Sequence, residues 1–169
     1  MTQRILLVGM MGAGKTTVGR LVAEKLGWQY LDSDTEVERS TGMTVPELFA
    51  REGETAFRDA ESAALVRACS GAEAVVVSVA GGAVLRTANR QLLMESGEVV
   101  WLRARPATLA ARVGDGSGRP LLEGDAAATL IELDAERRPF YLELADVAID
   151  VDELSASEVA TCILNEVGQ

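Results

Sequence analysis

The sequence contains no histidine, and only two of its 169 residues are cysteines. The absence of histidine excludes catalytic triads with an imidazole base and metal sites with histidine ligands. Any catalysis must therefore use carboxylates, lysine, arginine or backbone amides. The two cysteines, Cys69 and Cys162, lie far apart without CxxC spacing, so neither a disulfide framework nor a zinc cage is indicated. We expect both to be small buried apolar side chains.

Long apolar runs are also missing, since none reaches the roughly 18 residues that a membrane-spanning helix needs. The first four residues lead directly into a strand pattern, so we expect no signal peptide. Basic residues number 16 against 26 acidic ones, a net charge of −10, which argues against a nucleic-acid partner. We expect a cytoplasmic monomer with no membrane or nucleic-acid partner, which binds anionic ligands through a few local Arg and Lys side chains.

The stretch Gly9-Met10-Met11-Gly12-Ala13-Gly14-Lys15-Thr16 follows an apolar run and precedes a helical pattern. Its GxxxxGKT spacing, between a strand and a helix, is typical of a phosphate-binding loop. Glycines let successive backbone N–H groups surround an anion, and the helix adds the positive end of its dipole. In this interpretation Lys15 reaches the β- and γ-phosphates and the Thr16 hydroxyl binds Mg²⁺. The alternative is a glycine-rich turn with an exposed lysine.

Alternating apolar and helical patterns predict five strands, at 5–8, 28–31, 74–79, 99–102 and 147–150. Helices are expected between them, including 87–95, 106–113, 126–144 and 156–167, with Pro139 bending or breaking the third of these. The fold class is thus α/β, a three-layer doubly wound domain with a five-stranded parallel sheet, spanning 1–169. Helices between the second and third strands predict an inserted lobe at about 33–61, and three glycines beside an arginine predict a lid at about 113–124.

Within the lobe, Thr44 and Glu47 have the form of a capping box that begins a helix, and Gly53 should interrupt that helix. The acidic pair Asp32 and Asp34 follows the second strand. Ligands collect at the carboxyl ends of parallel strands, so this pair should lie close to the phosphate loop.

Several further motifs narrow the interpretation: Asp32-Ser33-Asp34, Phe57-Arg58 with Glu61, Gly81-Gly82, Arg119-Pro120-Leu121-Leu122 and Glu136 to Tyr141. With the phosphate loop, they resemble shikimate kinases, a small group in the nucleoside-monophosphate-kinase-like branch of P-loop proteins. The resemblance runs from about Ile5 to Val167. It implies a P-loop kinase fold and transfer of the ATP γ-phosphoryl to the 3-hydroxyl of shikimate, with Mg²⁺ as cofactor.

The resemblance also implies residue roles. Lys15, Asp34 and Arg119 are the expected catalytic residues, and Thr16 and Asp32 the expected Mg²⁺ site. ATP contacts are expected from Gly12, Ala13, Gly14, Lys15, Thr16, Thr17, Arg112 and Arg119. Shikimate contacts are expected from Asp34, Arg58, Gly81, Gly82, Arg137, Phe49, Phe57 and Glu61, with Val45 and Leu121 against the ring. Nearby cations should favour the ionised form of Asp34, making it a weak base that aligns the hydroxyl.

Four of these residues also fit purely structural roles. Capping a helix could be the sole role of Asp34. Arg58 and Glu61 could form an exposed ion pair, and Arg137 could be surface charge. Ala80 departs from the three-glycine turn usual in the family, and we expect activity to survive it. The competing functions are another small-molecule kinase of this branch, such as a gluconate kinase, and a nucleotide-dependent binding module without acceptor chemistry.

Overall fold

The computed structural model describes residues 3–114, 119–122 and 124–167, and its centre is a five-stranded parallel sheet. The strand order is β2-β3-β1-β4-β5. Their bounds are β1 Arg4–Val8, β2 Gln29–Asp32, β3 Val75–Ser78, β4 Glu98–Arg103 and β5 Val147–Asp150. All residues of β1 and β3 are buried, as expected for central strands covered on both faces. The predicted α/β fold class is therefore confirmed.

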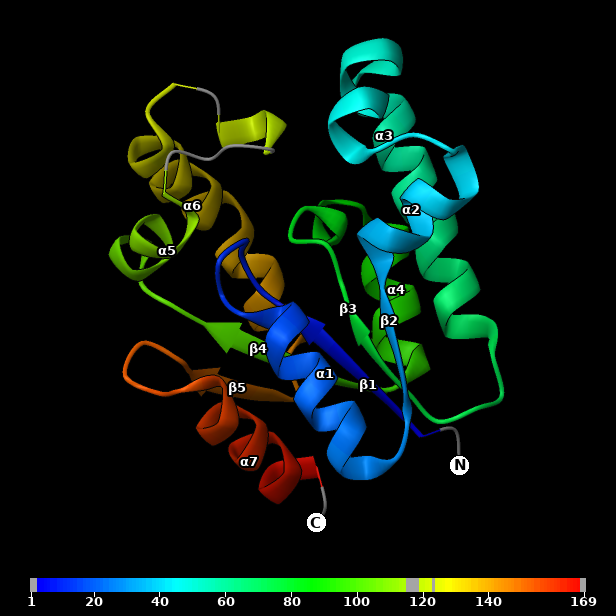
Figure 1. Ribbon diagram of the computed structural model, residues 1–169, viewed down its shortest axis with the longest axis vertical. Coiled ribbons are helices and arrows are strands. Elements are labelled where there is room, and N and C mark those ends of the chain that lie inside the picture. The colour runs from blue at the N-terminus through cyan, green and yellow to red at the C-terminus, as the bar shows by residue number, and fades with distance from the viewer. Residues whose placement is uncertain (1–2, 115–118, 123, 168–169) are drawn as a thin grey trace.

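Helices cover both faces of the sheet and complete three layers (Figure 1). Helices α1 (Lys15–Leu26) and α7 (Ala156–Val167) pack together on one face. The other face carries α4 (Thr87–Ser96) and α6 (Ala126–Leu144), and α5 (Pro106–Val113) packs on α6. Of two short 3-10 turns, η1 (Ala83–Leu85) contacts α4 and α6, and η2 (Pro120–Leu122) contacts α6. Pro139 was expected to bend or break α6. It does not break the helix, because α6 is continuous through Pro139.

The predicted lobe consists of α2 (Ser33–Thr41) and α3 (Val45–Ser70), which pack against each other. The capping box at Thr44 and Glu47 is present, and Gly53 interrupts α3 with φ of 85° and ψ of 176°. Both predictions are thus confirmed. The lobe has its own hydrophobic cluster, formed by Val37, Leu48, Phe57 and Ala64. The main core lies around the sheet and forms a separate cluster among the described residues.

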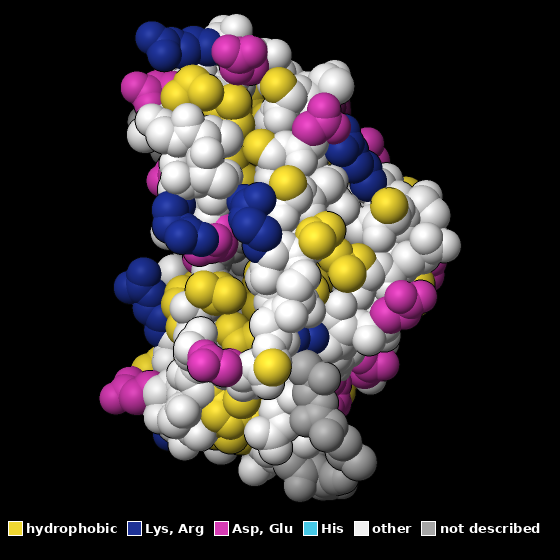
Figure 2. All heavy atoms as spheres, turned by 90° about the vertical axis from the view of Figure 1, so that its right-hand side faces the viewer, with side chains coloured by type: hydrophobic (Ala, Val, Ile, Leu, Met, Phe, Trp, Pro, Cys, Tyr) yellow, Lys and Arg dark blue, Asp and Glu magenta, His cyan; other side chains and the backbone are white. Residues whose placement is uncertain are grey.

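The exposure of the cysteines differs from what the sequence predicts. Cys69 and Cys162 are free and half-buried rather than fully buried. None of the helices described is both long and apolar enough to cross a membrane. Figure 2 shows acidic and basic side chains interspersed on the face that includes the lobe, so the negative net charge is not segregated there.

Candidate active site

The phosphate loop joins β1 to α1 as the sequence predicts. Gly12 and Gly14 have φ of 83° and 96°, a left-handed conformation that side chains rarely adopt. Gly14 is the N-cap of α1, and no side chain caps the helix there. The first N–H groups of α1 are therefore available to an anion, which the helix dipole also favours.

Lys15 lies at the start of α1 and folds back over the loop. Its Nζ donates to the carbonyl oxygens of Gly9 at 2.7 Å and Met10 at 3.0 Å. Burial lowers the pKa of Lys15 to about 8, while Asp34 and Asp32 act in the opposite direction. The lysine is thus a half-buried cation in front of the anion-binding helix end.

Asp32 connects the phosphate loop with the lobe. One carboxylate oxygen accepts hydrogen bonds from the N–H groups of Asp34 at 2.9 Å and Thr35 at 3.4 Å, capping α2. The other accepts from the Thr16 hydroxyl at 3.2 Å. The cap of α2 is therefore Asp32 and not Asp34. A hydroxyl beside a carboxylate at a phosphate loop is the oxygen donor set that suits Mg²⁺, so these residues fit that ion.

Asp34 faces the pocket and has a buried carboxylate oxygen, Oδ1, without a hydrogen-bond partner among the described residues. Burial, followed by the charge of Asp32, raises the pKa of Asp34 to about 6, against the opposing effects of Lys15 and Arg58. The expectation that nearby cations would make Asp34 a weak base was wrong, because the loss of hydration outweighs their attraction. A carboxylate with this pKa accepts a proton more readily than an ordinary aspartate.

Two polar residues that sequence reasoning missed support this edge of the site. The Tyr30 hydroxyl donates to Ser78 Oγ at 2.9 Å and approaches Asp32 Oδ2 at 3.3 Å. Ser78 in turn donates to the carbonyl of Lys15 at 2.9 Å. The signal for Ser78 was available, because it is the single hydroxyl in an otherwise apolar strand of four residues.

Arg58 and Glu61 form a buried ion pair rather than an exposed one. Arg58 Nη1 donates to both carboxylate oxygens of Glu61, at 3.1 and 3.0 Å, and Glu61 is fully buried. Burial raises the pKa of Glu61, and the guanidinium of Arg58 opposes that rise. Arg58 Nη2 lies 3.5 Å from a second carboxylate, that of Glu54, and Arg58 itself lines the pocket.

Arg137 is also buried, with 1% of its surface exposed. No carboxylate of the described residues lies within ion-pair distance of it, and its Nε has no hydrogen-bond acceptor there. The next residue, Arg138, is paired with Asp134 at 3.0 Å. Arg137 is thus a buried cation on the pocket wall rather than surface charge. A buried charge is costly without a partner, and a bound anion would supply one.

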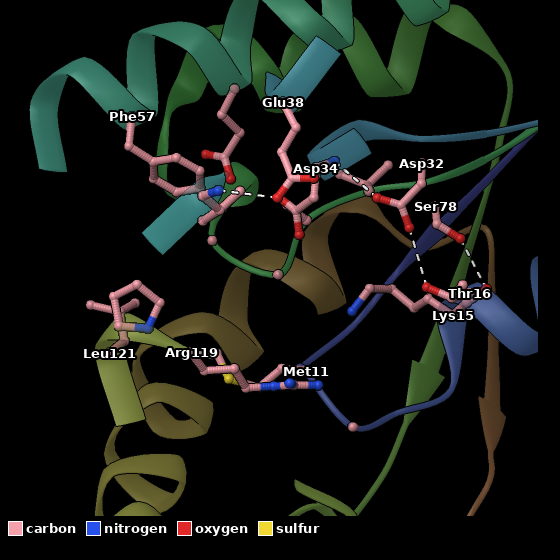
Figure 3. Close-up of a pocket in the computed structure, with 18 of the residues that line it drawn as sticks. Met11, Lys15, Thr16, Asp32, Asp34, Glu38, Phe57, Ser78, Arg119 and Leu121 are labelled. Atoms are coloured by element: carbon pink, nitrogen blue, oxygen red, sulfur yellow. Dashed lines mark hydrogen bonds between the residues drawn. The ribbon is translucent and has the colours of Figure 1, made fainter. Parts of the chain in front are cut away.

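The predicted site residues meet in one pocket of about 460 Å³ between the phosphate loop and the lobe (Figure 3). Figure 3 shows Lys15 extending into this space below Asp34, with Arg119 and Leu121 on the opposite wall from Phe57. Phe49 and Phe57 lie 5.1 Å apart between ring centroids and form an apolar wall. The lining includes the following residues named from sequence: Gly12, Gly14, Lys15, Thr16, Thr17, Asp32, Asp34, Val45, Phe49, Phe57, Arg58, Glu61, Gly81, Gly82, Arg119, Leu121 and Arg137.

Two predicted nucleotide contacts lie outside this lining. Ala13 is buried beneath the loop. Arg112 is exposed and donates to the carbonyls of Gly12 at 3.2 Å and Val151 at 3.3 Å, beside a second, shallower depression. The predicted lid is described only in part: Gly114, Arg119–Leu122 and Gly124 belong to the described residues, and 115–118 and 123 lie outside them.

A phosphate loop at the carboxyl edge of a parallel sheet, lining one pocket together with a carboxylate and two buried arginines, defines a P-loop phosphotransferase with a small anionic acceptor. Comparisons with known proteins narrow this class. The sequence profile of the shikimate kinase family matches residues 11–168. Shikimate kinase of Moorella thermoacetica is 47% identical over 160 residues, which cover 95% of this chain and 91% of that protein. The chain belongs to the shikimate kinase family.

Solved structures agree with this assignment. Shikimate kinase from Acinetobacter baumannii, in complex with shikimate, superimposes with a TM-score of 0.95 at 40% identity, covering 99% of this chain and 93% of that one. A gluconokinase from Sinorhizobium meliloti superimposes with a TM-score of 0.62 at 22% identity, covering 99% and 92%. At that identity the gluconokinase shares the fold alone.

Proposed function

We propose that this pocket transfers the γ-phosphoryl group of ATP to the 3-hydroxyl of shikimate, with the acceptor held between the lobe and α6. The observation that carries this assignment of roles is Arg137, a buried guanidinium without a carboxylate partner in the described part of the chain. The shikimate carboxylate would be its counterion. Arg58 would bind the same carboxylate with the guanidinium N–H groups that Glu61 leaves free.

Asp34 orients the 3-hydroxyl and takes its proton as the oxygen attacks the γ-phosphorus. The hydroxyl oxygen forms the new P–O bond, the bond to the β–γ bridging oxygen breaks, and ADP leaves. A pKa of about 6 suits this role, because Asp34 is largely ionised at neutral pH yet basic enough to receive a proton.

Lys15 and Arg119 stabilise the negative charge that spreads over the transferring phosphoryl group. Thr16 and Asp32 would hold Mg²⁺, Asp32 through a water molecule, and the ion when bound neutralises charge on the β- and γ-phosphates. Gly12 to Thr17 enclose the phosphates with backbone N–H groups. Arg112 would lie along the adenine, since the carbonyls of Gly12 and Val151 hold its guanidinium beside the loop.

The apolar wall would exclude water and pack on the ring of the acceptor. Phe57 of the lobe lies across the pocket from Leu121 of η2, and Val45 and Phe49 also line it. Exclusion of water matters here because water competes with the acceptor for the phosphoryl group. We also propose that the chain acts as a monomer in the cytoplasm. Light scattering in the presence of both substrates would test the oligomeric state.

The test is ADP release with Mg²⁺-ATP, with and without shikimate, for the wild type and Arg137→Ala. Loss of a charge-assisted bond should raise the KM for shikimate by about 10- to 100-fold, and leave the KM for ATP unchanged. Arg137→Ala is a cleaner probe than Arg58→Ala, which leaves Glu61 buried without its partner.

Arg138→Lys is the control, since Arg138 pairs with Asp134 and is not among the lining residues, and lysine keeps a cation for the buried Asp134. Its KM for shikimate should equal that of the wild type. Equal effects of the two substitutions would contradict the role of Arg137. Turnover that is stimulated by gluconate and not by shikimate would reject the acceptor.

A further inference from the structure

The turn that follows β3 has most of its peptide groups already hydrogen-bonded. The N–H of Ala80 donates to Ser33 Oγ at 2.8 Å, and the carbonyl of Ala80 accepts from the N–H of Ala83 at 3.0 Å. The carbonyl of Gly82 accepts from the N–H of Leu85 at 3.2 Å. These bonds involve neither the N–H of Gly81 nor that of Gly82.

Those two N–H groups are the donors that the turn leaves available. Neither donates to any group among the described residues, and both glycines line the pocket. The remaining carbonyl, that of Gly81, accepts from the hydroxyl of Tyr141 at 2.7 Å. A side chain 60 positions away in sequence thus completes the hydrogen bonding of the turn.

Tyr141 itself lies behind the pocket wall. It is fully buried in α6, its ring centroid lies 5.7 Å from that of Trp101, and it is not among the lining residues. Burial raises the pKa of the Tyr141 hydroxyl far above its usual range, so the group remains a donor at all physiological pH values. It has no direct access to substrate.

A trans peptide unit is planar, with its C=O and N–H pointing in opposite directions. The carbonyl of Gly81 and the N–H of Gly82 belong to one such unit. We propose that Tyr141 is a positioning residue: by holding the carbonyl of Gly81 on the α6 side, it directs the N–H of Gly82 toward the bound acceptor. This inference rests on the proposed function, in which the acceptor is shikimate.

Tyr141 also fixes the turn relative to Arg137. The two residues are one helical turn apart and lie on the same buried face of α6. A Cβ atom added to Gly81 would lie 3.2 Å from Arg137 Nη1 and 3.5 Å from the Tyr141 hydroxyl. The glycine backbone therefore packs against both side chains. The hydrogen bond sets the spacing between a carboxylate-binding arginine and the backbone donors beside it.

Tyr141→Phe tests this positioning role, because the substitution removes only the hydroxyl group that bonds the carbonyl of Gly81. Shikimate affinity, measured calorimetrically without nucleotide, and the steady-state KM for shikimate should both weaken about three- to tenfold, as expected for one buried hydrogen bond. The KM for ATP should stay unchanged, and kcat at saturating shikimate should change less than KM.

Ser96→Ala is the control, because Ser96 is not among the lining residues and its hydroxyl donates to the carbonyl of Leu92 at 2.5 Å within α4. The loss of this hydroxyl should leave shikimate affinity unchanged. Equal weakening in both variants, or a rise in the KM for ATP in Tyr141→Phe, would mean general loosening and overturn the inference. Wild-type protein that fails to bind shikimate would instead reject the proposed function.

Nitrogen-15 glycine labelling gives a second readout in the wild type. The Gly82 amide resonance should shift when shikimate binds, and this shift should shrink in Tyr141→Phe. A Gly82 amide that does not respond to shikimate in the wild type would overturn the inference regardless of how the variant folds.

Discussion

Gly82→Ala would displace the guanidinium of Arg58 without straining the backbone. Gly82 has φ of −89° and ψ of −4°, which alanine adopts freely. A Cβ atom there would lie 2.6 Å from Arg58 Nη2 and 2.7 Å from Arg58 Cζ, whereas ordinary contact begins at 3.4 Å. The guanidinium must therefore move away from the new Cβ atom by up to about 1 Å.

Arg58 has little freedom to retreat. It is 7% exposed, and two hydrogen bonds of 3.1 and 3.0 Å hold it to the fully buried Glu61. A misplacement of about 1 Å in a substrate-positioning group can cost about 100-fold in rate. We expect kcat/KM for shikimate to fall by about 10- to 100-fold through KM, with the KM for ATP unchanged.

The assay is coupled ADP release with each substrate varied in turn. Gly71→Ala is the control, because Gly71 also has an unstrained φ of −68° and a Cβ there meets nothing within 4 Å. An unchanged KM for shikimate in Gly82→Ala would refute the argument that the guanidinium of Arg58 binds the acceptor from its present position. A rise in both KM values would point to a distorted sheet edge instead.

Three further predictions concern Asp34, which lies beside the phosphate loop, and Ala80, which lies in this turn. Asp34 acts only when ionised, and its pKa is about 6, so kcat/KM should fall about tenfold per unit as the pH drops below 6. Asp34→Asn should lose most of kcat, with a small change in the KM for ATP; near-normal kcat would remove Asp34 from the mechanism. Ala80→Gly should leave both kinetic constants unchanged, because Ala80 has no left-handed φ and its N–H is bonded to Ser33. A lower KM for shikimate in that variant would contradict this.

The sequence predicted the strands and helices closely because their signals are local. The apolar run of β3, the capping box at Thr44 and the interruption at Gly53 depend on neighbouring residues, and the structure confirms all three. The phosphate loop was equally accessible, since its spacing is fixed by the turn from β1 to α1. Pro139 gave a local signal too, but one that the surrounding helix accommodates on its exposed face.

The features of the site that the sequence did not predict depend on contacts between segments that are distant in the chain. The raised pKa of Asp34 results from burial, which no local pattern reports. Tyr141 stood within a recognised motif, yet its partner is a carbonyl 60 residues away. Arg137 and Arg138 are adjacent in sequence, and only the packing of α6 shows that Arg137 is buried on the pocket wall while Arg138 is half-buried and paired with Asp134.

The separate hydrophobic cluster of the lobe divides the enzyme into two halves that can vary independently. Val37, Leu48, Phe57 and Ala64 pack with one another and share no member with the core around the sheet. Substitutions in this cluster can reshape the acceptor wall while the phosphate loop and its supporting strands keep their packing. A nucleotide-binding half can thus be retained while the acceptor half changes.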